Sequence, residues 1–178
     1  MSTVRPCEIP QTSLLCKARE SGAYADCFVT DISGAVSQSA FIEAFYTTAP
    51  FKVERALLRW LLARPSTDFE AHQLAEGATT SFAAWRVEGR SADQLLLADV
   101  TGRTQSWLMV APVTGTAVSA ATRLYFGSAV VARVDAGTGA RTMGFAFHAL
   151  LGFHRLYSRL LLGAARSRLL ARRRAGAS

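Results

Sequence analysis

Residues 143–172 limit the possible folds of this chain most strongly, because their pattern is that of one long amphipathic helix. At 100° per residue, apolar side chains gather on one face of the segment, among them Tyr157, Leu161 and Ala164. His148 and the arginine side chains gather on the opposite face, whereas His154 lies near the centre of the apolar face. An apolar helix face must be buried against another layer of structure, so the preceding sequence is expected to supply that layer.

The sequence before this helix has the alternation of period two that is typical of β-strands. Strands are predicted at about 24–30, 81–88, 94–100, 103–111 and 121–134. The last four follow one another through short links, which favours antiparallel pairing. The sequence therefore predicts an α+β fold, in which a twisted antiparallel sheet wraps around the long C-terminal helix.

Three shorter helices are expected between the first strand and the rest of the sheet. They cover about 38–47, 50–63 and the segment between Thr67 and Gly77. The third helix has a capping box, since the Thr67 hydroxyl and the Glu70 carboxylate can each accept a hydrogen bond from an unpaired backbone N–H. Gly77 is then suited to end the helix in a left-handed conformation.

Length and composition favour one domain. The chain has 178 residues, of which 50% are hydrophobic and 19% charged, so it can bury a core. We divide it into an N-terminal arm (1–22), a single α+β domain (23–172) and a basic tail (173–178).

Several classes of protein are disfavoured by what the sequence lacks. No apolar run reaches the roughly 18 residues needed to cross a bilayer, and no apolar segment typical of a secretory signal follows the N-terminus. The three cysteines have neither the spacing of a disulfide framework nor that of a zinc site. Phosphate-loop, dinucleotide, zinc-protease and serine-hydrolase motifs are absent. We therefore expect a cytoplasmic protein with no metal and no cofactor.

Charge is concentrated at the C-terminal end. Residues 141–178 contain eight arginines and no acidic residue, whereas residues 1–140 are nearly neutral. The candidate surface for an anionic partner consists of Arg155, Arg159, Arg166 and Arg173. A solvated helix face explains the same pattern, and peripheral contact with a membrane surface stays open. Nucleic acid is not expected, because no binding motif or set of stacking aromatics accompanies the arginines.

Polar and aromatic residues on otherwise apolar elements are the other candidates for a site. His154 and Tyr157 are expected to point from the long helix toward the sheet. A hydrogen-bonded core pair and a ligand contact both explain them. On the strands, either face could point inward. The candidate ligand-binding residues are His154, Tyr157, Trp107, Tyr125, Phe126 and Arg123.

Several segments resemble a family of bacterial domains that has no assigned activity and is similar to the START-like, helix-grip superfamily. They are Phe45-Tyr46 with Glu54-Arg55 and Leu58, Gly77 with Phe82 and Trp85, Thr104-Gln105-Ser106-Trp107, Leu124-Tyr125-Phe126-Gly127-Ser128-Ala129, and Phe153-His154-Arg155 with Tyr157-Ser158. The resemblance covers about residues 24–165. It implies an apolar cavity under the long helix, lined by His154 and Tyr157, of the kind that holds lipids, polyketides, sterols or aromatic molecules.

Three hypotheses about function follow. The first is a module that binds a small apolar molecule between the sheet and the long helix. The second is an enzyme of the cyclase or hydrolase kind in the same cavity, with His154 or a carboxylate as general base. The third is an interaction protein that docks its arginines on anionic lipid or an acidic partner.

Overall fold

The structure is a computed structural model. It describes residues 3–62, 66–113, 120–130, 133–134, 141–142 and 145–176, with side chains other than those of 54, 57–62, 133–134, 141–142 and 145–153. In this part of the chain, no helix combines the length and the apolar character needed to cross a membrane.

An antiparallel sheet of seven strands forms the centre of the described structure, in the order β1-β2-β7-β6-β5-β4-β3. The strands are β1 (Arg5–Pro6), β2 (Tyr24–Ser33), β3 (Ser81–Phe82), β4 (Trp85–Arg90), β5 (Gln94–Asp99), β6 (Thr104–Pro112) and β7 (Ala121–Val130). A separate pair joins β8 (Arg133–Val134) to β9 (Arg141–Thr142). The predicted α+β class and the antiparallel pairing are thus confirmed.

The sheet has two more strands than the sequence predicts. β1 lies in the segment expected to be an arm, and the strand expected at 81–88 is divided into β3 and β4. Ala83 between them has a positive φ of 52°, a conformation that no regular strand contains. Short interruptions of this kind do not change the period-two pattern from which the strand was predicted.

Three helices fill the long connection between β2 and β3, as predicted. They are α2 (Gln38–Tyr46), α3 (Ala49–Leu62) and α4 (Asp68–Glu76). Ser37 caps α2 by accepting a hydrogen bond from the N–H of Ala40. The predicted capping box of α4 is present, and Gly77 follows in the left-handed conformation at φ 77°.

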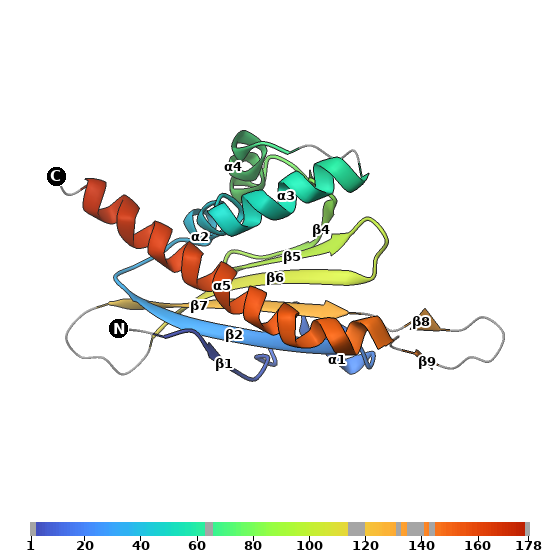
Figure 1. Ribbon diagram of the computed structural model, residues 1–178. Coiled ribbons are helices and arrows are strands. Elements are labelled where there is room, and N and C mark those ends of the chain that lie inside the picture. Colours follow the sequence, from blue (N-terminus) through green and yellow to red (C-terminus); the bar gives the residue numbers. More distant parts are fainter. Residues whose placement is uncertain are drawn as a thin grey trace.

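The long C-terminal helix is α5 (Phe145–Gly176). Figure 1 shows it crossing the sheet diagonally, with α2, α3 and α4 grouped on one side of it. It contacts β2, β7, α2 and α3. Leu161, Leu162, Ala165 and Leu169 are buried in these contacts. Residues 173–176, which we assigned to a tail, continue the helix.

Alternation sorts the side chains of each strand onto two faces. We call the face toward α5 the inner face, and the other the outer face. On β7, Leu124 and Phe126 belong to the inner core, whereas Tyr125 packs in a second core on the outer face. On β6, Leu108 belongs to the inner core and Trp107 to the outer one. Neighbouring residues of one strand therefore serve different cores.

The N-terminal segment covers the outer face of the sheet instead of extending into solvent. Ile9 and Leu15 are buried there, with Ala18 of α1 (Cys16–Glu20). Gln94 holds the segment in place, because its Oε1 accepts hydrogen bonds from the N–H of Leu14 and from the indole N–H of Trp107, both at 2.9 Å. The sequence of this segment shows no clear period, so its packing could not be predicted from a pattern.

Gly127 is the point at which this cover approaches the sheet most closely. A Cβ atom at Gly127 would lie 2.8 Å from Leu15 Cδ2 and 2.9 Å from Trp107 Cε3, both closer than carbon atoms pack. We expect Gly127→Ala to lower the free energy of unfolding by about 1–3 kcal/mol, since overpacking forces neighbouring side chains to move. Urea denaturation measures this effect. Gly163→Ala is the control, because the nearest atom to a Cβ at Gly163 would be Val4 Cγ2 at 3.8 Å, an ordinary packing distance. An unchanged unfolding midpoint for Gly127→Ala would contradict the close packing.

Candidate functional site

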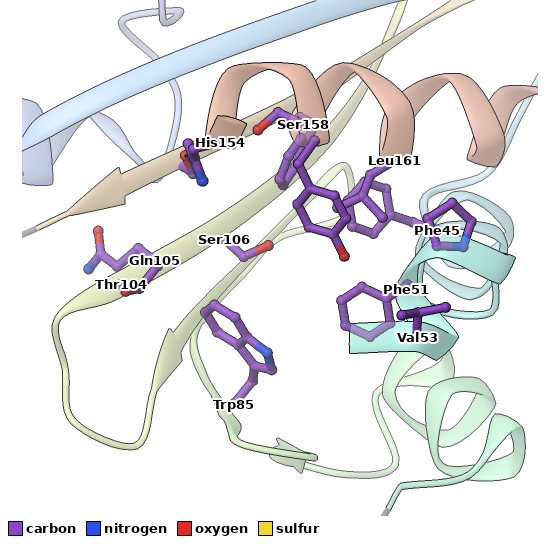
Figure 2. A pocket seen from close by; sticks show the side chains of 14 residues that line it. Phe45, Phe51, Val53, Trp85, Thr104, Gln105, Ser106, His154, Ser158 and Leu161 are labelled. Carbon is purple, nitrogen blue, oxygen red and sulfur yellow. Dashed lines mark hydrogen bonds between the residues drawn. The ribbon is translucent and has the colours of Figure 1, made fainter. Parts of the chain in front are cut away.

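A pocket of about 370 Å³ lies on the inner face, between α5, the start of α3 and the sheet. Figure 2 shows side chains converging on it from the helices and from the strands. Its wall is mostly apolar. The lining residues are Phe45, Pro50, Phe51, Val53, Trp85, Thr104, Gln105, Ser106, Phe126, Ser128, His154, Tyr157, Ser158 and Leu161. Val53 is 63% exposed, so the pocket opens to solvent at α3.

Packed aromatic rings build one end of the pocket. The ring centroids of Phe45 and Phe126 are 4.8 Å apart, and those of Phe45 and Phe51 are 6.2 Å apart. Phe45 comes from α2, Phe51 from α3 and Phe126 from β7, so three elements are fixed to one another here. Offset ring contacts of this kind add to the stabilisation from buried area. The apolar wall is therefore a rigid part of the inner core.

The other end of the pocket carries a polar cluster formed by Asp26, Ser128 and His154. Asp26 and Ser128 are direct partners in the pairing of β2 with β7. Ser128 Oγ donates a hydrogen bond to Asp26 Oδ1 at 2.7 Å and lies 2.6 Å from His154 Nε2. Asp26 Oδ2 is 3.9 Å from the same nitrogen. The side chain of Asp26 is only 10% exposed and that of His154 is 30% exposed, so a buried carboxylate lies behind a more accessible imidazole.

The charge of Asp26 also acts on a second neighbour. Burial and, next, the Asp26 carboxylate raise the pKa of the Tyr24 hydroxyl above its usual value, and Arg155 partly offsets the effect. An anion near a phenol disfavours the phenolate, so Tyr24 stays a neutral hydroxyl beside the cluster.

Three buried polar atoms of pocket residues have no hydrogen-bonding partner among the described residues. They are Trp85 Nε1, Gln105 Oε1 and Ser158 Oγ. Asp26 Oδ2, behind His154, is a fourth atom of this kind. All four atoms are buried, so they lie within or behind the pocket wall and do not face its open space.

Three of the six predicted ligand-binding residues line the pocket. His154 and Tyr157 reach it from α5, and Phe126 reaches it from β7. Trp107, Tyr125 and Arg123 lie on the outer face and do not line it. Trp107 is fully buried and packs against Tyr125, with ring centroids 6.1 Å apart. The reason is strand alternation: Phe126 points inward, and its neighbours of odd number must therefore point outward.

Several residues in or beside the pocket were not among the candidate ligand-binding residues, although Trp85, Ser128 and Ser158 belong to segments that carry the resemblance. Ser128 and Asp26 are separated by more than a hundred positions, and only the register of β2 with β7 brings them together. Ser158 carried a usable signal, because it follows His154 by four positions and so lies on the same face of α5. Trp85 lies at the start of β4, where the interruption after β3 makes the inward face hard to assign.

The four arginines of the candidate anionic surface have different roles in the structure. Arg155 and Arg159 are exposed, and the Arg159 guanidinium lies 5.5 Å from the centre of the Phe28 ring. Arg166 donates a hydrogen bond to the carbonyl of Asp31 at 3.0 Å. Arg173 donates to the carbonyls of Ser33 and Ala35. Arg166 and Arg173 therefore fix α5 to the end of β2 and the turn after it.

A metal site is not formed by the described residues, among which no group of three or more histidine, cysteine, aspartate or glutamate side chains is suitably placed. Comparison with models of known protein families gives no match. Comparison with curated protein sequences also gives no match.

Arg123 forms an ion pair with Asp31 across β2 and β7, with Nε 2.7 Å from Oδ1. The hydrogen bond from Arg123 holds the pKa of Asp31 below its usual value. A lowered folded-state pKa stabilises the protein above the unfolded-state value of about 3.9, and this stabilisation disappears as the pH falls through the folded-state pKa. At neutral pH, Arg123→Gln should lower the free energy of unfolding by about 0.2–1 kcal/mol, because the pair is partly exposed.

Urea denaturation at several pH values tests this prediction. The difference between Arg123→Gln and the parent protein should shrink below about pH 4. Arg86→Gln is the matched control, since Arg86 is exposed and has no ion pair among the described residues. A difference that stays constant down to acid pH would show that Arg123 contributes through packing and not through the ion pair.

Proposed function

We propose that the protein binds a small molecule in this pocket, and that the molecule has an apolar body and at least one polar group. The observation that carries the proposal is the combination of an apolar wall with the polar side chains of His154 and Ser128 at one end. Ligand sites have this composition: apolar area supplies affinity, and a few polar groups fix orientation.

The polar cluster gives the pocket its chemical selectivity. His154 and Ser128 line the pocket beside its apolar wall. A hydrogen bond formed in place of one to water contributes about 0.5–1.5 kcal/mol. The pocket thus favours a ligand with a polar group near His154 over a pure hydrocarbon.

The size of the pocket fits this class of ligand. Its volume of about 370 Å³ lies at the lower end of the range of roughly 300–1,000 Å³ that is typical of small-molecule sites. The opening at Val53 gives a path from solvent. We expect a compact molecule and not a long acyl chain.

We also propose that the chain is a helix-grip domain of the START-like kind. The support is the order of elements: one long strand, a group of helices, consecutive antiparallel strands and a long final helix. The first long strand, β2, pairs with the last long strand, β7, so the sheet curves beneath α5. The position of the pocket between α5 and the inner face agrees with a ligand cavity of that fold.

Docking of the arginines on an anionic partner is a weaker proposal. Arg166 and Arg173 donate hydrogen bonds to the protein's own carbonyls, so binding of a phosphate or carboxylate would compete with contacts that hold α5. Arg155 and Arg159 are the exposed members, and two cations give a weak surface site.

Binding of 1-anilinonaphthalene-8-sulfonate, an apolar fluorophore with one anionic group, tests the proposed function. We expect saturable binding to the native protein. Val53→Glu should weaken it by about tenfold, since a carboxylate at the opening must lose water when the pocket fills. Leu156→Glu is the matched control, because Val53 and Leu156 are 63% and 66% exposed and Leu156 does not line the pocket.

Fluorescence titration measures both affinities, and urea denaturation confirms that the two variants are folded. Equal weakening by Val53→Glu and Leu156→Glu would place the fluorophore elsewhere on the surface. The absence of saturable binding to the parent protein would also contradict the proposed function.

A further inference from the structure

We propose that the pocket is a site of proton transfer, in which His154 Nδ1 removes a proton from a bound, uncharged carbonyl compound. The inference rests on the proposed function, because it requires a molecule in the pocket. It goes further by assigning a reaction class and by giving roles to Ser128 and Asp26.

Hydrogen counting in the polar cluster determines which ring nitrogen can accept a proton. The Ser128 hydroxyl has one hydrogen, and it donates this hydrogen to Asp26 Oδ1. The contact of 2.6 Å between Ser128 Oγ and His154 Nε2 then requires a hydrogen on Nε2. A neutral imidazole has only one N–H, so Nδ1 carries the lone pair. Nδ1 has no hydrogen-bonding partner among the described residues, and the His154 side chain lines the pocket.

Asp26 supplies the charge that a general base in this position needs. When Nδ1 takes a proton, the ring becomes a cation, and an apolar surrounding disfavours that cation. The Asp26 carboxylate lies behind Ser128, with Oδ2 3.9 Å from Nε2, and its side chain is 10% exposed. A buried anion at this distance stabilises the imidazolium more than a solvated one would. His154 is therefore the catalytic residue, and Ser128 and Asp26 are positioning residues.

The reaction balances without an oxidant, a reductant or a metal. The C–H bond adjacent to the substrate carbonyl breaks, and its proton bonds to His154 Nδ1. The electron pair forms a carbon–carbon double bond, and the carbonyl π electrons move to oxygen, giving an enolate beside the His154 imidazolium. Return of the proton to a different carbon completes an isomerisation. The substrate class is thus small, mostly apolar carbonyl compounds with an acidic C–H bond.

The base-induced ring opening of 5-nitrobenzisoxazole provides a test with a defined probe. A base removes the single C–H proton of the isoxazole ring, the nitrile forms, and the N–O bond breaks to give a coloured phenolate. We expect the protein to accelerate this step. His154→Gln should reduce the protein-dependent rate by about 100-fold or more, as expected for loss of a general base. His72→Gln is the matched control, because His72 hydrogen bonds to Glu43 outside the pocket.

The positioning residues are tested by a readout that does not depend on turnover. Proton–nitrogen correlation NMR of the imidazole should show hydrogen on Nε2 and a lone pair on Nδ1 of neutral His154. Ser128→Ala should abolish this preference and lower the rate by about tenfold, the value of one hydrogen bond. Asp26→Asn keeps an acceptor for the Ser128 hydroxyl but removes the charge, so we expect the tautomer to persist while the rate falls.

Affinity for 1-anilinonaphthalene-8-sulfonate, measured for every variant, separates the two proposals. Saturable binding combined with a rate that His154→Gln does not change would overturn proton transfer and leave the proposed function intact. An NMR spectrum that shows neutral His154 with its hydrogen on Nδ1 would also overturn proton transfer. Loss of binding in the parent protein would overturn both. Saturable binding to His154→Gln, with the rate lost, is the result that supports both.

Discussion

The pairing of β2 with β7 is the interaction on which the rest of the structure depends. Ten residue pairs join the two strands, from Tyr24 with Val130 to Ser33 with Ala121. This pairing places the first long strand beside the last one. The strands that follow the three helices, β3 to β7, therefore belong to the same sheet as β2. It also sets Asp26 opposite Ser128 at the position where α5 brings His154.

Both faces of the sheet must be covered, and the chain uses different means for each. Two regular amphipathic helices, α5 and α2, cover the inner face. The outer face is covered by a short segment whose contacts are specific, as the hydrogen bonds of Gln94 and the close approach at Gly127 illustrate. The inner cover is incomplete beside α3, and the pocket lies there. The site is thus a consequence of how a straight helix and a twisted sheet fit together.

The elements with strong local signals were predicted well. The capping box at Thr67 and the turn at Gly77 define α4 in both the sequence and the structure. The period of α5 correctly placed His154 and Tyr157 toward the sheet, since a helix of this length has only one apolar face. The sequence did not indicate which face of β7 points inward. Tyr125 and Phe126 were both candidates, although the side chains of two neighbours on one strand point to opposite faces of the sheet.

The amino-acid sequence by itself determined the α+β class, the positions of the long helices and most strand boundaries, because these depend on local periodicity, caps and turns. Only the tertiary structure decided which strand face points inward and that Asp26, Ser128 and His154 meet. The physical reason is that register and packing join residues far apart in the chain. No local pattern records that Ser128 will find both a carboxylate and an imidazole within hydrogen-bonding distance.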